Sequence, residues 1–473
     1  MAGPVRYGHA PGSLPLIGHV HRLLLDPLTF LSSLPEHGDL VRVHVGATPT
    51  VVVCDPALAR QVLLEDRTFD KNDPLLINLR EVLGNGLATC PHAAHRRQRR
   101  LIQPAFHRDR LARYAATMAR HISETVDSWQ EGQDIDVADT MTHLTTRVAM
   151  ATMLTDRLPP DQADQLAEDL SATMTVGLIR SVIPRPLLLL PVPANRRFAQ
   201  AQARIRRTVG ALITAARKDS VDHGDLLSML LLPDAEHQDA FNDTEIADQI
   251  STFFFAGIET TANLLSSTLH LITGSPTWQQ RMRDEIQHTA DGADLDLARL
   301  DELATTHQVL TETLRLFPPV WMTPRMTAVD TELGGHRIAA GTRVIVSAHQ
   351  LHRVDRNYPA AEDFAPDRWA ARKPPRDGYF PYGGGARKCI GDEFGHTQAV
   401  ITLATILNRW HLEPIEGPRI GRDCRDAGRP LGLRLRVTPA RGSAPAPPPA
   451  TTTQPTATSG ETTHPRRSNA HHA

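Results

Sequence analysis

The sequence predicts a mainly α protein, with one large helical domain and a small β-rich part. Two observations support this fold class. Apolar residues recur three and four positions apart through most of the chain between Pro56 and Leu316, which is the pattern of amphipathic helices. Hydrophobic residues make up 41% of the 473 residues and charged residues 22%, a balance typical of a globular protein with a substantial core.

The elements follow in order along the chain. The Pro- and Gly-rich residues 9–20 indicate an extended segment, and "LVRVHVG" with "TVVVCD" predicts a β-hairpin. Helical periodicity is clearest in "LARYAATMARHISETVDSW" and "VADTMTHLTTRVAMATML", whereas the prolines of "SVIPRPLLLLPVPAN" predict a loop. The segment "IADQISTFFFAGIETTANLLSSTLHLITG" is long enough to cross a domain as one helix, with Gly274 and Pro276 as its stop signal.

After Leu316 the pattern changes. "GGHRIAAGTRVIVSAH" predicts strands joined by a turn, and "EFGHTQAVITLATILNRW" predicts a last helix. We expect the folded domain to cover residues 1–438. From 439 to 473 the composition shifts to Pro, Thr, Ser and Ala, which predicts a disordered tail.

Charge and cysteine usage argue against several classes of protein. The formal net charge is −2, whereas a dedicated nucleic-acid-binding protein is usually strongly basic, so no nucleic-acid partner is expected. The cysteines form no CxxC pair and are far apart, which suits a reducing cytosol. No stretch has eighteen uninterrupted apolar residues and no signal-peptide pattern is found. We therefore expect a cytoplasmic protein without a membrane span.

"FPYGGGARKCIG", residues 380–391, combines three glycines, two cations and one cysteine. A phosphate-binding loop would need a different glycine spacing and a Ser or Thr after the lysine, where Cys389 follows Lys388. A zinc site is not supported, because no second cysteine or histidine lies within ligand spacing. For an isolated cysteine, a buried free thiol in an ordinary loop would be the simplest interpretation.

The stretch resembles the heme-ligand loop of the cytochrome P450 family, whose pattern is aromatic-x-x-Gly-x-Arg/His-x-Cys-x-Gly. The matching residues are Tyr382, Gly385, Arg387, Cys389 and Gly391, with tyrosine in place of the more usual phenylalanine. The resemblance implies the P450 fold, heme b as cofactor, Cys389 as the axial thiolate ligand of iron, and Arg387 as a partner of a heme propionate. A thiolate ligand pushes electron density onto iron and favours O–O cleavage, a property for which this family is the reference case.

"AGIETT" places Ala256, Glu259 and Thr260 on one face of the long helix, because they stand at i, i+3 and i+4. Taken alone, the threonine could bond to its own helix and the glutamate could lie at the surface. The resemblance implies that Ala256 leaves room for O2 beside the heme. It also implies that Thr260 donates a hydrogen bond to O2 and that Glu259 helps to relay protons.

"ETLR" places Glu312 and Arg315 one turn apart, which could be an ordinary exposed pair. The resemblance implies instead a buried structural pair, completed by Arg368 of "PDRW". Such a pair is costly unless every partner is present. We therefore expect loss of any member to prevent folding or heme uptake.

"HAAHRRQRRLIQPAF" places His95 and Arg99 four residues apart on a predicted helix. Together with Arg325 of "TPRM", they match positions where the family binds the heme propionates. A rival interpretation takes Cys90, His92 and His95 as a metal site. The neighbouring arginines at 96, 97 and 100 could be solvated, or could form a basic face for an acidic electron donor.

The resemblance as a whole implies a monooxygenase that inserts one oxygen atom from O2 into a small hydrophobic molecule, with electrons from a ferredoxin and ferredoxin reductase or a similar donor. Stretches such as "HRRQRRLIQPAFH", "PVPANRRF" and "DTELGG" look like actinobacterial terpene-oxidising members of the family, which implies a terpene substrate, specifically a sesquiterpene. Three alternatives stay open: another lipophilic substrate such as a polyketide, steroid or fatty acid; a heme-thiolate isomerase or dehydratase that does not use O2; and a non-catalytic heme protein.

The substrate pocket is expected from matching positions on three segments, each of which could equally be ordinary core. The candidate residues are Leu76, Leu87, Phe253, Phe254, Val320, Trp321, Met322 and Thr323.

Overall fold

The computed structural model describes most of the chain. The described residues are 4–46, 48–154, 157–182, 190–219, 221–233, 239–290, 297–415, 421–423 and 429–440. Part of the proline-rich segment expected to be a loop (183–189) and most of the expected C-terminal tail (441–473) lie outside them.

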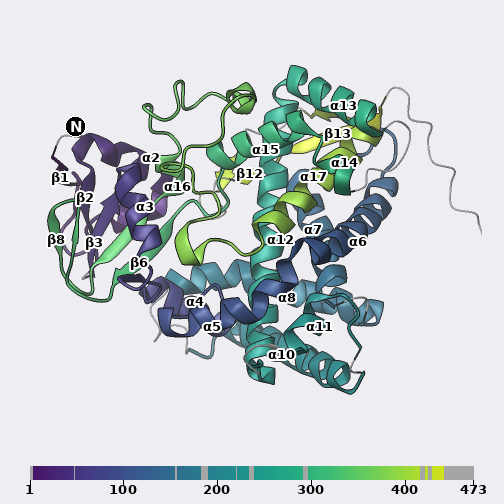
Figure 1. Ribbon diagram of the computed structural model, residues 1–473, viewed down its shortest axis with the longest axis horizontal. Helices are drawn as coiled ribbons and strands as arrows, with labels where there is room; N and C mark the ends of the chain where they lie inside the picture. The colour runs from purple at the N-terminus through teal and green to yellow at the C-terminus, as the bar shows by residue number, and fades with distance from the viewer. Residues whose placement is uncertain are drawn as a thin grey trace, which may run out of the picture.

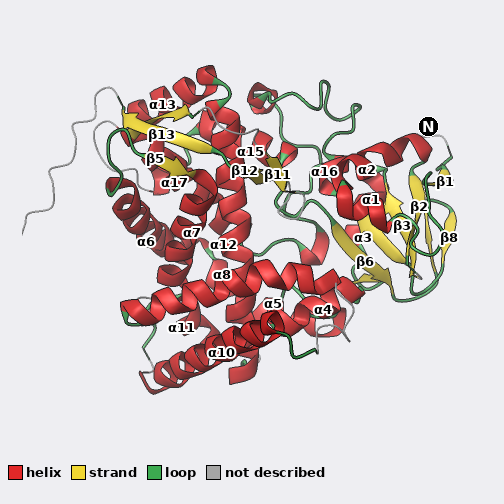
Figure 2. Cartoon of the chain, turned by 180° about the vertical axis from the view of Figure 1, so that it is seen from behind, coloured by secondary structure: helices red, strands yellow, loops and turns green. Residues whose placement is uncertain are grey.

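Helices build the larger part of the molecule and strands gather mainly at one side of it (Figure 1 and Figure 2). The helices are α1 (Val20–Leu25), α2 (Pro27–Ser33), α3 (Pro56–Leu64), α4 (Pro74–Leu83), α5 (His92–Ile102), α6 (Arg108–Asp127), α7 (Val137–Leu154), α8 (Pro160–Val182), α10 (Pro193–Asp219), α11 (Leu226–Leu231), α12 (Asp243–Thr273), α13 (Pro276–Ala290), α14 (Leu297–Leu300), α15 (Ala304–Leu316), α16 (Ala348–Leu351) and α17 (Asp392–Arg409).

The strands are short. They are β1 (Tyr7–His9), β2 (Leu40–Val45), β3 (Thr48–Val53), β4 (Phe69–Asp70), β5 (Asp134–Asp136), β6 (Thr323–Thr327), β7 (Thr331–Leu333), β8 (His336–Ile338), β9 (Arg343–Val346), β10 (Trp410–Pro414), β11 (Gly421–Asp423), β12 (Arg429–Leu431) and β13 (Arg434–Pro439). The mainly α fold class with a small β-rich part is therefore confirmed.

Helix α12 is one uninterrupted helix, as predicted. It begins with a capping box in which Asn242 and Glu245 each accept a backbone N–H of the other. It ends before Gly274 and Pro276. Its 31 residues span about 46 Å at 1.5 Å per residue, and it crosses the helical part of the molecule (Figure 1).

The largest sheet has the order β1-β2-β3-β9-β6-β4. The predicted hairpin is present as antiparallel β2 and β3. The two strands predicted in "GGHRIAAGTRVIVSAH" are also present, but they do not pair with each other. β8 pairs with β7, whereas β9 lies between β3 and β6. Burial explains why β9 pairs with β3 and β6 and not with β8. Val344–Val346 are buried, and a strand in the centre of the large sheet is covered on both faces.

A second sheet, with the order β10-β13-β5, was missed by the sequence analysis. Strand β13 joins β5, about three hundred residues earlier in the chain, and no local turn announces that pairing. A signal was nevertheless present, because "RLRV" alternates exposed Arg434 and Arg436 with buried Leu435 and Val437. The expected end of the folded domain at residue 438 falls inside this strand.

The described part of the chain contains no helix that is both long and apolar enough to cross a lipid bilayer.

Candidate functional site

The cysteine loop lies between α3 and α17. Gly385 has φ of +64°, and a side chain there would bring Cβ within 2.3 Å of the Leu63 carbonyl oxygen on α3. The glycine is therefore required by close contact with α3 as well as by its backbone conformation. The Cys389 N–H donates to the carbonyl oxygen of Tyr382 at 2.9 Å, which holds the cysteine just before the first turn of α17.

The Cys389 side chain keeps accessible surface, although desolvation by the surrounding protein raises the pKa of its thiol. A backbone hydrogen bond from Gly391 acts in the opposite direction, because it favours the thiolate. A thiol that is both accessible and desolvated is suited to ligating a cation, since coordination supplies the charge needed to deprotonate it.

The central part of α12 also keeps accessible surface at Ala256, although Phe253 and Phe254 just before it are buried. The Thr260 hydroxyl donates to the Ala256 carbonyl oxygen at 2.5 Å. This is the local back-bonding that is common for threonine in helices. Ala256, Glu259 and Thr260 thus share one face of the helix, and the small alanine leaves that face open.

Arg325 on β6 is almost completely buried, and its Nε has no hydrogen-bond partner among the described residues. Burial and then repulsion by Arg387 lower the pKa of its guanidinium to about 10. A buried donor without an acceptor is costly. The Nε–H of Arg325 could therefore donate a hydrogen bond to a negatively charged oxygen of a bound group, such as a propionate.

Lys71 belongs to the same cationic group and was missed by the sequence analysis. Its Nζ donates to the Ala88 carbonyl oxygen at 2.9 Å. Burial, followed by repulsion from Arg325 and Arg387, lowers the pKa of the Lys71 ammonium to about 7. No local pattern marks Lys71, because its neighbours come from distant parts of the chain.

His95 on α5 is buried, and burial is the largest cause that lowers the pKa of its imidazole to about 3, followed by repulsion from Arg387 and Lys71. His95 is therefore neutral near pH 7 and can act as a neutral hydrogen-bond donor. Arg99, one turn later, donates from Nη1 to the carbonyl oxygens of Ala386 and Lys388 at 3.1 and 2.7 Å. It ties α5 to the cysteine loop, and its predicted contact with a propionate stays a prediction.

Arg387 is buried and already has anionic partners. Its Nε lies 3.3 Å from an oxygen of Asp66, and its Nη2 lies 3.2 Å from an oxygen of Asp70. Its Nη1 donates to the Cys90 carbonyl oxygen at 2.9 Å. Arg387 was predicted to meet a propionate; in addition, it braces the cysteine loop against β4 and against Cys90, which precedes α5.

The rival metal site at Cys90, His92 and His95 is wrong. Within the described ranges, no group of three or more His, Cys, Asp or Glu side chains is placed to hold a metal ion. His92 instead pairs with Asp66 at 3.0 Å. Cys90 is buried, and its sulfur lies 3.6 Å from the Leu87 carbonyl oxygen.

The expected basic face on α5 is largely neutralised. Arg97 and Arg100 both lie 3.0 Å from Asp239, and Arg97 also pairs with Glu245 at 2.6 Å. Of the three arginines, Arg96 is exposed, whereas Arg97 and Arg100 are partly buried.

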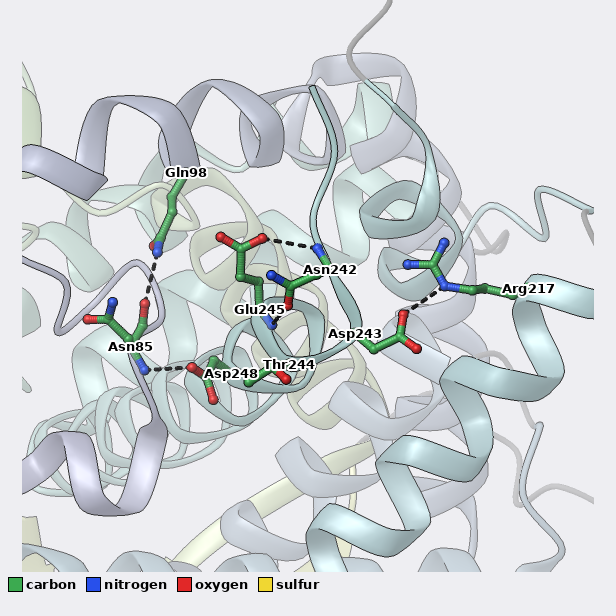
Figure 3. Close-up of a pocket in the computed structure, with 8 residues that line it drawn as sticks. All are labelled: Asn85, Gln98, Arg217, Asn242, Asp243, Thr244, Glu245 and Asp248. Carbon is green, nitrogen blue, oxygen red and sulfur yellow. Dashed lines mark hydrogen bonds and ion pairs between the residues drawn. The ribbon is translucent and has the colours of Figure 1, made fainter. Parts of the chain in front are cut away.

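A polar pocket of about 720 Å³ lies nearby, at the start of α12 (Figure 3). Its carboxylates serve the local structure: Glu245 belongs to the capping box, Asp243 pairs with Arg217 at 2.7 Å, and Asp248 accepts the Asn85 N–H at 2.8 Å. The polar residues that line this pocket join neighbouring helix ends through these bonds. None of the predicted site residues lines it.

Glu312 and Arg315 form the buried pair that the sequence predicted, and both side chains are fully buried. Arg315 donates from Nε and Nη2 to the two carboxylate oxygens at 2.9 and 2.8 Å. Arg368 adds a bond from Nε at 3.0 Å, and Trp369 adds one from Nε1 at 2.9 Å.

His352 connects this buried pair to the cysteine loop. One ring nitrogen lies 3.2 Å from the Arg315 carbonyl oxygen, and the other accepts the Phe380 N–H at 2.7 Å.

The eight pocket candidates fall into different environments. Val320 is 51% exposed. Phe254 and Leu87 are buried in the core that includes Ile250 and Ile258. The rest are partly or fully buried: Leu76 on α4, Phe253 on α12, Trp321 and Met322 against the core beneath the large sheet, and Thr323 at the start of β6. Their contacts with a substrate stay predictions.

The site therefore combines an accessible thiol, an open face of small residues on α12, and buried cations with an unfilled donor. These features fit an iron porphyrin with its propionates, and they define a heme-thiolate protein. Comparison with known proteins gives the family. A family model, Cytochrome P450, matches residues 9–424. The chain belongs to the cytochrome P450 family and is a heme-dependent monooxygenase.

Two similar proteins come from Streptomyces. Cyclooctat-9-en-7-ol 5-monooxygenase of Streptomyces melanosporofaciens is 41% identical over 421 residues, which is 88% of this chain and 91% of that protein. Pentalenene oxygenase of Streptomyces avermitilis is 39% identical over 442 residues, covering 91% and 97%. Among solved structures, the heme domain of cytochrome P450DA has a TM-score of 0.83 at 26% identity, covering 93% of this chain and 99% of that one.

Proposed function

We propose that this P450 monooxygenase inserts one oxygen atom from O2 into a terpene hydrocarbon, with a sesquiterpene as the expected substrate. The observation that carries the proposal is the similarity, over about nine-tenths of the chain, to two enzymes whose names describe oxidation of terpenes. The apolar character of most of the candidate pocket residues supports it, because a hydrocarbon offers no group for polar recognition.

The heme, when bound, supplies the oxidation chemistry itself. Cys389 would ligate its iron, and Arg325 and Lys71 would meet its propionates; the partnerless Nε of buried Arg325 supports this assignment. Arg387 braces the loop through Asp66 and Asp70.

Thr260 and Glu259 are the groups proposed to manage protons. The Thr260 hydroxyl donates to the Ala256 carbonyl oxygen and can hold a proton at Oγ1 on the open face of α12. Glu259 precedes it and can supply protons as a general acid. This acid–alcohol pair favours a monooxygenase over an isomerase or dehydratase, which would have no need to deliver protons to oxygen.

A ferredoxin with its reductase is the proposed electron source, and the cytoplasm is the proposed location. Exposed Arg96 on α5 and exposed Lys388 within the cysteine loop are candidate contacts for an acidic donor. Lys388 also pairs with Asp392. The described cysteines are free thiols, which suits a reducing compartment.

The decisive experiment is the absorption spectrum of the purified holoprotein, reduced and exposed to carbon monoxide, together with Cys389→Ser. The wild type should show the red-shifted Soret band of thiolate ligation, and the variant should lose it. An unshifted band in the wild type would contradict the heme-thiolate assignment.

Substrate class is then tested by titrating the ferric protein with sesquiterpene hydrocarbons, steroids and fatty acids. A spectral shift with the sesquiterpenes, followed by product formation with a ferredoxin system, would support the proposal. A shift and product only with a steroid or fatty acid would assign the alternative substrate.

A further inference from the structure

The loop between α4 and α5, residues 84–91, is held against α12 by two buried glutamine side chains. Gln249 on α12 is 0% exposed, and Gln98 on α5 is 3% exposed. Burying such polar side chains is costly unless their donors and acceptors find partners. Neither glutamine belongs to the residues predicted to bind the heme or the substrate, so their burial calls for another explanation.

The two side-chain amides form one circuit with the loop, which we call the glutamine clamp. The Leu87 N–H donates to Oε1 of Gln249 at 2.9 Å. Nε2 of Gln249 donates to Oε1 of Gln98 at 3.1 Å, and Nε2 of Gln98 donates to the Asn85 carbonyl oxygen at 2.9 Å. Because the loop offers an N–H at one end and a carbonyl at the other, only one orientation of each amide satisfies all three bonds.

The loop backbone lies in close contact with α12 beside this clamp. Asp248 accepts the Asn85 N–H at 2.8 Å (Figure 3). A side chain at Gly86 would bring Cβ within 2.1 Å of the Thr252 hydroxyl oxygen. The loop therefore touches the helix directly, and the glutamine clamp keeps it there.

The same loop also contacts the cations of the heme site. Its Ala88 carbonyl oxygen accepts a hydrogen bond from Lys71 at 2.9 Å. Its Cys90 carbonyl oxygen accepts one from Arg387, also at 2.9 Å. The loop thus connects the start of α12 to the cationic side of the heme site.

Gln249 stands at a defined distance from the open face of α12. It precedes Ala256 by seven residues, which is two turns on the same side of the helix and about 10 Å along its axis. Leu87, which Gln249 holds, belongs to the same buried apolar cluster as Phe253, one turn before Ala256. The clamp therefore fixes the loop about two helical turns from the open face.

We propose that Gln249 and Gln98 are positioning residues that set the length of the substrate space between this loop and the open face of α12. The proposal rests on the proposed function, because it assumes a hydrophobic substrate beside the heme. A hydrocarbon offers no polar group for orientation, so a fixed wall decides which of its carbons reaches the reacting position. A wall that is already ordered also avoids the cost of ordering the loop when substrate binds.

The test measures how the ferric holoprotein discriminates between ligands of different length. N-butylimidazole, N-octylimidazole and N-dodecylimidazole are the probes, because their ring nitrogen ligates heme iron and shifts the Soret band. The variants are Gln249→Met and Gln98→Met, since methionine keeps the length of the side chain and removes the amide.

The matched control is Gln279→Met on α13. Gln279 is 4% exposed, and its amide makes two bonds with the Leu412 backbone, at 3.1 and 3.2 Å. The control therefore loses a comparable set of buried hydrogen bonds, but these bonds hold β10 and not the loop.

The measured quantity is the Kd of the dodecyl probe divided by the Kd of the butyl probe. The wild type and Gln279→Met should give the same ratio. Gln249→Met should lower it about tenfold, because a released wall admits the longer chain and one methylene group in an apolar pocket is worth about 10- to 200-fold. If the ratio in Gln249→Met equals that in Gln279→Met, the clamp does not set the pocket length and the proposal is refuted.

The second variant tests whether the two amides act together. Gln98→Met should lower the ratio in the same direction, and the double variant should lower it no further than Gln249→Met alone. Fully additive shifts would contradict a single circuit. Gln98→Met keeps the bond between Leu87 and Gln249, so it also serves as the test if Gln249→Met does not fold.

Hydrogen exchange followed by mass spectrometry is the second measurement, because the loss of buried hydrogen bonds could destabilise the whole protein. Exchange in a peptide that covers residues 84–91 should become on the order of tenfold faster in Gln249→Met and stay at the wild-type rate in Gln279→Met. Equal exchange of this peptide in both variants would overturn the proposal.

The imidazole probes require a heme but no terpene, which separates the clamp from the proposed function. A changed length ratio in Gln249→Met without any response of the wild type to sesquiterpenes would support the clamp and reject the proposed substrate. An intact carbon monoxide band with an unchanged length ratio would refute the clamp alone. Absence of the thiolate band in the wild type would refute the heme-thiolate function and the clamp's role with it.

Discussion

Replacing Glu312 with glutamine should destabilise the protein far more than a surface substitution can. The carboxylate is fully buried and accepts hydrogen bonds from Arg315, Arg368, Trp369 and the Ala365 N–H at 2.8 to 3.0 Å. Glutamine keeps the shape, but it removes the negative charge and turns one acceptor oxygen into a donor. The buried Arg315 guanidinium and the partly buried Arg368 guanidinium would then face an amide N–H.

The magnitude follows from these contacts. Removing one partner of a buried ion pair costs about 3–5 kcal/mol, because the remaining charge stays desolvated. Arg315 is fully buried, so its positive charge would stay desolvated in the variant. Its other hydrogen bonds go to the carbonyl oxygens of His352, Ala361 and Asp363, which carry no negative charge to compensate for it. The loss is a large share of a typical stability of about 5–15 kcal/mol.

The assay is urea denaturation followed by far-UV circular dichroism, together with the heme content of the purified protein. The matched control is Asp367→Asn, next to Arg368. Asp367 pairs with Arg281 at 3.0 Å, but the two side chains are 64% and 44% exposed. An exposed pair of this kind contributes at most about 1 kcal/mol. Equal losses of stability in Glu312→Gln and Asp367→Asn would refute the reasoning.

Four further outcomes are expected. Gly385→Ala should displace the cysteine loop from α3 and lower heme content, whereas Gly383→Ala, whose new Cβ meets nothing within 4 Å, should show only the milder cost of its φ of +69°; equal heme content in both would contradict this. Thr260→Ala should raise the ratio of O2 consumed to product formed, and an unchanged ratio would remove it from the proton relay. Lys71→Met should speed transfer of heme to apomyoglobin on the order of tenfold, because a charged hydrogen bond is worth about 1.5–3 kcal/mol; an unchanged rate would exclude a propionate contact. Burial lowers the pKa of His352 from 6.5 to about 3, so the unfolded chain binds this proton first as the pH falls. The free energy of unfolding should therefore decrease below pH 6.5 by up to about 1.4 kcal/mol per pH unit from this residue, and His352→Gln should show a correspondingly shallower slope in urea titrations from pH 7 to pH 5.

Local patterns in the sequence determined a large part of this description. The long helix α12, the helices α6, α7 and α17, and the hairpin β2–β3 all follow from periodicity and stop signals that neighbouring residues carry. The cysteine loop and the Glu312, Arg315 and Arg368 set could likewise be recognised, because their residues stand at characteristic short spacings within each motif.

Other features depend on residues that are far apart in the chain, and only the tertiary structure could decide them. The pairing of β13 with β5 crosses about three hundred residues, so no local turn predicts it. Lys71 joins Arg325 and Arg387 only after β4, β6 and the cysteine loop have packed together. The same packing gives Arg387 its two carboxylate partners.

Burial and charge explain the difference between the two groups of features. Whether a lysine titrates near pH 7, whether an arginine keeps an unfilled donor, and whether a thiol stays accessible all depend on which distant groups surround it. The sequence by itself therefore indicated Cys389 and Arg325 as residues that could hold a heme, whereas the tertiary structure added Lys71 and decided how the charges around the site are balanced.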